Sequence, residues 1–175
     1  MDMKKHSALS FFSLYLIYGL DLIGLVLVYV IFSPLILNPE SNMIAKSFSI
    51  QTRNITIGAL LGIYPLAQFF AAPILGEISD RLGRKKILLL SISGTIVSFA
   101  LSAFSIHIHS LSLLFISRLI SGIFAGNLTI AQAAVAGMAA PTKKAQSMAL
   151  FATVGGVAWT IGPFLGVLLS NSHLI

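Results

Sequence analysis

Long apolar runs separated by short polar segments make up most of this chain. Two of them, residues 55–75 and 87–106, are each long enough to cross about 30 Å of hydrocarbon at about 1.5 Å per residue. Segments with proline, charge or several polar residues separate the runs from one another. The pattern therefore predicts an all-α, polytopic transmembrane bundle with about five helices, at residues 9–32, 55–75, 87–106, 110–138 and 145–169.

The composition is that of a membrane protein. Of the 175 residues, 57% are hydrophobic and 9% are charged, whereas a soluble domain carries about 25% charged residues. The chain has no cysteine, which excludes disulfides and cysteine metal sites. No nucleophile and base pair, phosphate-binding loop or metal-ligand cluster stands out, so we expect no enzyme, cofactor or metal, and transport driven by an ion gradient.

The formal charge of +6 follows membrane topology and does not indicate a nucleic-acid partner. Short loops rich in Lys and Arg are retained in the cytoplasm during insertion. Most basic residues fall in segments that share one side of the predicted spans: Lys4, Lys5, Arg81, Arg84, Lys85, Lys86, Lys143 and Lys144. We therefore expect the N-terminus inside and an uncleaved first helix, because the run at residues 9–32 is too long for a signal peptide.

The densest patch of charge is residues 76–86, between the second and third predicted helices. We expect a short hairpin loop outside the bilayer, in which Gly83 supplies a turn with positive φ and Gly76 lets two helix ends approach. Asp80 is expected within reach of Arg81 and Arg84. The alternative is a solvated turn that only obeys the positive-inside rule.

The spacing of this patch resembles a family signature, Gly76-x-x-x-Asp80-Arg81-x-Gly83-Arg84-Lys85. It is similar to the cytoplasmic loop between the second and third helices of major facilitator superfamily transporters. The resemblance implies two six-helix halves built from three-helix repeats, of which this chain holds most of the first. It also implies that the loop aspartate engages the opposing C-terminal half, here a missing partner, and that the chain is a fragment, a truncated product or an excised portion.

Two ionisable side chains interrupt apolar spans, Asp21 in the first and Arg118 in the fourth. Each costs at least about 2.5 to 3.5 kcal/mol to insert. Counted from opposite faces, they lie roughly 18 Å and roughly 12 Å deep, at a similar level. We expect them to pair or to share a water-filled cavity. A carboxylate that alternates between apolar surroundings and an arginine carries a proton; the alternative is a fixed ion pair that only holds helices together.

Three segments resemble the drug/proton antiporter branch of the superfamily, which includes tetracycline exporters. They are Gly19-Leu20-Asp21-Leu22-Ile23-Gly24, Arg118-x-x-x-Gly122-x-x-x-Gly126 and Gly162-Pro163-Phe164-Leu165-Gly166. The resemblance implies proton coupling through Asp21 and Arg118. In the third segment Pro163 removes one backbone hydrogen bond of the helix, while Gly162 and Gly166 let a neighbouring helix pass close. We expect this segment, called the seam below, to bend against that neighbour. Val167 departs from the signature, and an ordinary kinked helix is the alternative.

Other polar and aromatic side chains within the spans are candidates for a substrate path: Tyr64, Gln68, Asn127, Gln132 and Trp159. Each equally fits a contact between helices. The spacings Gly58-x-x-x-Gly62 and Ala72-x-x-x-Gly76 predict close packing of the second helix, and the third helix is expected to be a lipid-facing support.

Together these features predict the N-terminal portion of a proton-coupled efflux antiporter. We expect it in the lipid bilayer of a bacterial inner membrane, with protons and a small, drug-like compound as its substrates. Two alternatives stay open: a truncated remnant that does not transport, and a symporter or facilitator of the same superfamily for sugars or metabolites.

Overall fold

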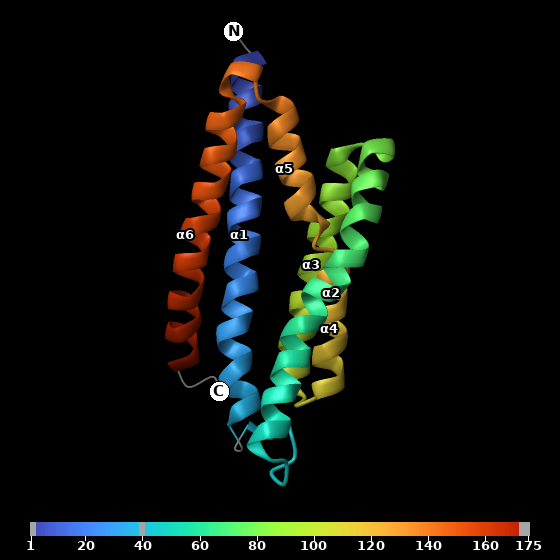
Figure 1. The fold of residues 1–175 in the computed structure, drawn as a ribbon, viewed down its shortest axis with the longest axis vertical. Coiled ribbons are helices and arrows are strands. Elements are labelled where there is room, and N and C mark those ends of the chain that lie inside the picture. Colours follow the sequence, from blue (N-terminus) through green and yellow to red (C-terminus); the bar gives the residue numbers. More distant parts are fainter. Residues whose placement is uncertain (1–2, 39–40, 172–175) are drawn as a thin grey trace.

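The computed structural model describes residues 3–38 and 41–171, and the side chains of residues 11–38 and 41–168. These residues form an all-α bundle in which the long helices run along the longest axis (Figure 1). The helices are α1 (Met3–Leu37), α2 (Ile50–Leu82), α3 (Arg84–His107), α4 (Leu111–Ile123), α5 (Gly126–Met138) and α6 (Lys144–Asn171), with a 3₁₀ helix, η2 (Pro141–Lys143), before α6.

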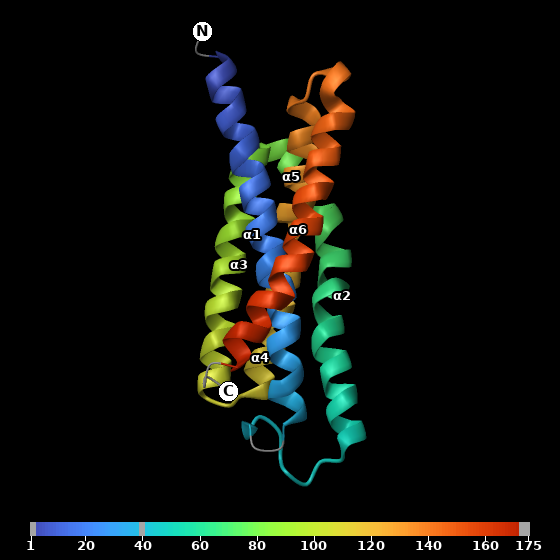
Figure 2. The same cartoon turned by 90° about the vertical axis from the view of Figure 1, so that its left-hand side faces the viewer.

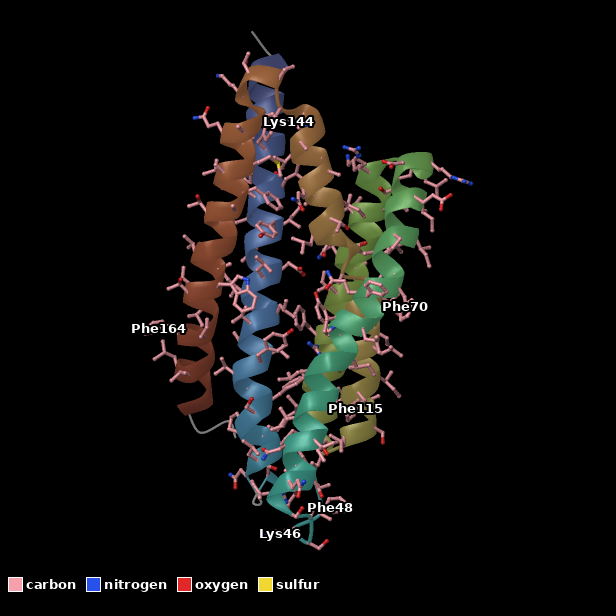
Figure 3. All side chains as sticks on the ribbon, viewed as in Figure 1. Lys46, Phe48, Phe70, Phe115, Lys144 and Phe164 are labelled. Carbon is pink, nitrogen blue, oxygen red and sulfur yellow. The ribbon has the colours of Figure 1, made fainter. Side chains whose placement is uncertain are left out.

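Five segments of the described chain are long and apolar enough to cross a membrane, with α4 and α5 counting as one span. The predicted fold class is therefore confirmed. Large apolar side chains cover the outside of the bundle, among them Phe69 at 72% exposure and Phe164 at 65%. Figure 3 shows Phe164 pointing away from α6 and from the rest of the bundle. Such a surface is expected where the solvent is lipid.

The helices are longer than the apolar runs predicted. The first was expected to end near residue 32, but α1 continues through Pro34 to Leu37, and the backbone N–H of Asn38 still donates to the Pro34 carbonyl at 2.9 Å. The φ of proline is compatible with a helix, so a proline can be accommodated when the helix gives up one N–H hydrogen bond and the preceding turn adjusts to the ring. The connection between the first two spans, predicted at residues 33–54, therefore begins only after Leu37 and ends before Ile50.

The loop at residues 38–49 folds back onto the end of the bundle. Met43 and Ile44 are buried there, at 4% and 5% exposure. Arg53, which precedes the second apolar run, is 2% exposed. It donates from Nη1 to the Ile36 carbonyl at 2.8 Å and from Nη2 to the Ala45 carbonyl at 3.2 Å. The arginine thus joins α2 to the end of α1 and to the loop, which the hydrophobic pattern does not reveal.

The fourth predicted span is broken in the structure. Residues 110–138 were expected to form one helix, but α4 ends at Ile123 and α5 begins at Gly126. The ring of Phe124 packs where Gly94 of α3 has no side chain. Gly126 lies against Leu75 of α2, so closely that an added Cβ would stand 3.0 Å from the Leu75 Cβ.

Two apolar clusters fill the interior, one at each end of the bundle. The loop-end cluster, next to residues 38–49, contains Val28, Phe32, Leu35, Ile36, Met43, Ile44, Leu60 and Leu114. The N-end cluster, toward the start of α1, contains Leu14, Ile87, Leu88, Ile130, Ala131, Val135 and Phe151. Helices α1 and α6 lie side by side, and α2 and α3 pack on α4 (Figures 1 and 2). Along α1, Asp21 falls between the two clusters.

Candidate functional site

Asp21 lines a pocket about halfway along the bundle, which is open toward the outside at Leu20 and Ile96. The carboxyl group is half-buried on α1. It lines a space of about 270 Å³ together with residues of α3 and α5, including Thr95, Phe99 and Asn127. Asn127 is the other strongly polar side chain in this lining. The rest of the lining is apolar, so this acid meets a small polar group in an otherwise hydrophobic pocket.

Asn127 owes its position to the break in the fourth span. It is the second residue of α5 and is 2% exposed. Its Oδ1 accepts the backbone N–H of Leu128 at 2.8 Å. That N–H belongs to the first turn of a helix, where backbone donors lack partners within the helix. A continuous helix through residues 110–138 would leave no such free donors here, so the side-chain arrangement follows from the break.

Arg118 is fully buried, at 1% exposure, and is held by α3 and by two aromatic rings. Its Nη2 donates to the Ser102 hydroxyl at 2.7 Å. Its Cζ lies 5.2 Å from the centroid of the Phe32 ring and 5.6 Å from that of Phe99. Both distances fall within cation–π range. Nε and Nη1 have no hydrogen-bond partner, so two donors of a buried cation remain unsatisfied.

Asp21 and Arg118 do not form an ion pair. Among the described side chains, the carboxylates that make salt bridges are those of Glu77 and Asp80. The expectation of direct pairing was therefore wrong, because Arg118 turns toward Ser102 and the aromatic rings. Tyr64 of α2, 7% exposed, interacts electrostatically with both Asp21 and Arg118. Acid and base thus share a tyrosine as a common neighbour.

A row of serines on α3 was missed by the sequence reasoning. Ser98, Ser102 and Ser105 are buried, and the Ser102 hydroxyl also donates to Ser117 of α4 at 2.8 Å. Helix α3 carries exposed apolar residues such as Ile96 and Phe104, which fit the expected lipid-facing support, but its other face binds Arg118 through Ser102. The signal was present in the sequence: hydroxyl residues recur at positions 91, 95, 98, 102 and 105, the spacing of a single helix face.

The charged turn is more helical than predicted. Residues 76–82 belong to α2 and α3 begins at Arg84, so Gly83 alone makes the turn, at a φ of 97°. The expected positive φ is confirmed, and the expected short hairpin loop at residues 76–86 is reduced to this single residue, with helix on both sides. Asp80 lies 3.6 Å from Arg84 as expected, but Arg81 pairs instead with Glu77 at 2.6 Å. These pairs at i and i+4 favour continuation of the helix.

Arg84 also connects this turn to the broken span. Its Nη1 donates to the Ala133 carbonyl of α5 at 2.6 Å. Gly137, one turn further along α5, leaves room for the guanidinium, because an added Cβ would stand 2.9 Å from Nη1. Gly76 does not make the expected close approach, since a Cβ there would meet nothing within 4 Å among the described residues. Lys85 is exposed.

The glycines of the predicted seam lie against α1. A Cβ on Gly162 would stand 2.9 Å from the Val26 Cβ, and one on Gly166 would stand 2.8 Å from the Val30 Cβ. Pro163 lies inside α6 without ending it. The structure thus shows the close packing of α1 and α6 at these glycines, while a role in antiport stays a prediction. By contrast, Gly58 and Gly62 of α2 face no neighbour within 4 Å in the described part of the chain.

Only some of the substrate-path candidates gather at Asp21. Tyr64 and Asn127 lie near it. Gln68 lines a separate surface pocket of about 560 Å³ between α2 and α5. Gln132 and Trp159 are exposed. Within residues 3–38 and 41–171, no cluster of three or more His, Cys, Asp or Glu side chains is placed to hold a metal ion.

Comparison with known proteins gives these residues a family context. The chain is 38% identical to major facilitator superfamily domain-containing protein 10 of Mus musculus over 118 residues, which cover 67% of this chain and 25% of that protein. It is 37% identical to the class H tetracycline resistance protein of Pasteurella multocida over 114 residues (65% and 28%). It is 34% identical to the class C protein of Escherichia coli over 117 residues (67% and 29%).

These matches cover between 25% and 29% of the length of the three relatives. The family model described as Major Facilitator Superfamily matches residues 9–174, which is nearly the whole chain. The five candidate spans fit an integral membrane protein of that kind. The chain belongs to the Major Facilitator Superfamily.

Proposed function

We propose that this chain is the N-terminal part of a proton-coupled exporter of a small, drug-like compound, embedded in a bacterial inner membrane with its N-terminus inside. One observation carries the proposal: Asp21 opens onto a mid-bundle pocket without an ion pair to Arg118. An acid that is not neutralised by a fixed cation is free to gain and lose a proton. The similarity to tetracycline resistance proteins supports export as the direction of transport.

In this mechanism Asp21 takes up a proton when the bundle opens to one side and releases it after the bundle has rocked to the other. Arg118 and Tyr64 bias that exchange in this proposal, with Tyr64, buried on α2, as the neighbour that connects them. The signature turn acts as a latch between conformations, with Asp80 engaging an opposing C-terminal half. The relatives are about four times longer than the matched region and have room for such a half.

The seam of Gly162, Pro163 and Gly166 is the proposed place where α6 bends against α1 as the bundle rocks. The close approach of both glycines to valines of α1 supports this assignment, since only small residues allow it. The proline removes one backbone hydrogen bond and so lowers the cost of bending.

The test compares Asp21→Asn with the unchanged protein in everted vesicles that are acidic inside. Tetracycline is added as the substrate, and a pH-sensitive dye records proton release. The unchanged protein is expected to release protons on addition of tetracycline, and Asp21→Asn to release none. Ser93→Ala is the control, because Ser93 is exposed on α3 and its hydroxyl donates within its own helix, to the Leu89 carbonyl. Export from a cell corresponds to uptake by an everted vesicle, so proton-coupled tetracycline uptake that survives Asp21→Asn would overturn the proposal. Release of tetracycline from preloaded vesicles together with protons would favour a symporter.

A further inference from the structure

Ser102 lies in the middle of a chain of hydrogen bonds between α3 and α4. Nη2 of Arg118 donates to the Ser102 hydroxyl at 2.7 Å, and that hydroxyl donates to the hydroxyl of Ser117 at 2.8 Å. Ser117 in turn donates to the Leu114 carbonyl at 2.7 Å. All four residues are buried, with Ser102 the most exposed at 4%. The chain of bonds therefore runs in one direction, from the guanidinium to a backbone carbonyl.

This direction makes Ser102 an acceptor for the arginine. A hydroxyl has one proton to donate and two lone pairs that accept, whereas a guanidinium only donates. The proton of Ser102 has acceptors in Ser117 and in the Ser98 carbonyl, which lies at 2.9 Å, so its lone pairs are left for Arg118. Nε and Nη1 of Arg118 have no hydrogen-bond partner. The guanidinium is thus anchored by hydrogen bonding at Nη2, through this serine.

The anchored guanidinium lies next to the pocket that Asp21 lines. Phe99 borders both, since its ring centroid is 5.6 Å from Cζ of Arg118 and its side chain lines the pocket. The ring also packs on α1 three residues after Asp21, where a Cβ on Gly24 would stand 3.0 Å from Cζ of Phe99. Arg118 is the only Lys or Arg in the five predicted spans. Its anchor therefore decides whether Asp21 has a counter-ion.

We propose that Ser102 is a positioning residue that holds Arg118 on α3 and so keeps Asp21 free of an ion pair. A carboxylate is a stronger acceptor for a guanidinium than a neutral hydroxyl is. Without the serine hydroxyl, the guanidinium turns toward the pocket and pairs with Asp21. Such a pair favours the ionised acid and opposes uptake of its proton. The consequence for transport rests on the proposed function, but the position of the arginine can be tested separately.

The experiment is labelling of the purified protein with dicyclohexylcarbodiimide, which reacts with protonated carboxyl groups in apolar surroundings. Mass spectrometry of the peptide that contains Asp21 measures the labelled fraction. The reagent is apolar, and the pocket is open toward the outside at Leu20 and Ile96. The unchanged protein is expected to be labelled at Asp21, and Ser102→Ala to be labelled at least about tenfold more slowly, because a neighbouring arginine favours the carboxylate. Ser102→Cys, with a weakly accepting sulfur, is the second variant if the alanine does not fold.

Two comparisons separate the anchor from packing. Ser98→Ala makes the same chemical change one turn earlier, at a buried serine whose hydroxyl donates to the Thr95 carbonyl of its own helix at 2.8 Å, and should leave the labelling rate unchanged. Arg118→Met in the Ser102→Ala protein removes the cation and is expected to restore labelling, which a packing defect would not allow. Equal rates in the unchanged protein and both Ser102 variants, failure of Arg118→Met to restore labelling, or no label on Asp21 in the unchanged protein would overturn the inference.

The vesicle assay separates the two proposals. If Asp21→Asn abolishes proton release while the Ser102 variants are labelled at the unchanged rate, the exporter stands and the role of Ser102 falls. If Asp21→Asn keeps proton-coupled tetracycline uptake while Ser102→Ala loses its labelling and regains it with Arg118→Met, the anchor stands and the exporter mechanism falls.

Discussion

Replacing Arg118 by methionine tests whether this residue is kept for stability or for function. Methionine has a similar length, is apolar and fills irregular spaces. Arg118 is 1% exposed and leaves Nε and Nη1 without hydrogen-bond partners. We expect the Arg118→Met protein to be as stable as the unchanged protein or more stable, and to lose proton-coupled export.

The magnitude follows from the contacts of the guanidinium group. Each unsatisfied buried donor costs about 1–3 kcal/mol, so the two together cost about 2–6 kcal/mol, and more because they are charged. Against this stand one charged hydrogen bond to Ser102, worth about 1.5–3 kcal/mol, and two ring contacts, worth about 0.5–2 kcal/mol each. The gains and costs nearly cancel before the desolvation of the charge is counted, which adds several kcal/mol to the cost.

Arg53→Met is the matched control for this prediction. Arg53 is also an arginine with 2% exposure, but both of its terminal nitrogens bind carbonyl oxygens, those of Ile36 and Ala45. Each charged hydrogen bond lost costs about 1.5–3 kcal/mol. Even a net loss of about 1.5 kcal/mol lowers the unfolding midpoint by about 3–6 °C in a chain of this size.

The assay is thermal unfolding in detergent, followed by circular dichroism, together with the vesicle assay. The expected pattern is a lower midpoint for Arg53→Met and an equal or higher midpoint without transport for Arg118→Met. A fall of several degrees in Arg118→Met, as large as that in Arg53→Met, would refute the reasoning and support a structural role for Arg118.

Two further substitutions test the packing of the helices. Gly122→Ala would place a Cβ 2.7 Å from that of Ala67, so we expect the free energy of unfolding to fall by about 1–3 kcal/mol from overpacking between α2 and α4. The control is Gly58→Ala, whose Cβ meets nothing within 4 Å and should leave the unfolding midpoint unchanged or raise it slightly. Gly83→Ala forces a side chain onto a residue with φ of 97° and ψ of 131° and should cost about 1–3 kcal/mol, measured in the same unfolding assay. Equal midpoints for Gly122→Ala and Gly58→Ala, or no loss in Gly83→Ala, would contradict the packing and the turn geometry described above.

The hydrophobic pattern predicted the spans well because it reports which residues meet lipid. It predicted helix ends poorly for the same reason. Helix α2 continues to Leu82 through charged residues, since backbone hydrogen bonds and pairs such as Glu77 and Arg81 sustain a helix outside an apolar run. The turn at Gly83 was predictable because positive φ values favour glycine.

The candidate site was predicted in its residues but not in its contacts. Counting residues along a helix gives the depth of Asp21 and Arg118 but not the direction in which each side chain points, which turns by about 100° per residue. The depth of Arg118 suggested pairing with Asp21, but the direction of its side chain brings it to Ser102 instead. The break before Asn127 was beyond sequence reasoning because it depends on the fit of Phe124 against Gly94 of another helix.

The break gives the two halves of the fourth span different surroundings. Helix α4 is fixed on α2 by Gly122, whose missing Cβ admits the backbone of α2, and on α3 by the bonds of Arg118 and Ser117 to Ser102. Helix α5 is tied instead to the signature turn, through the Arg84 bond to the Ala133 carbonyl. A movement of that turn would therefore be transmitted to α5 and its Asn127, while Arg118 remains in place. The break thus separates the half of the span that holds the buried cation from the half that borders the Asp21 pocket, so motion at the end of the bundle can reach the pocket without displacing Arg118.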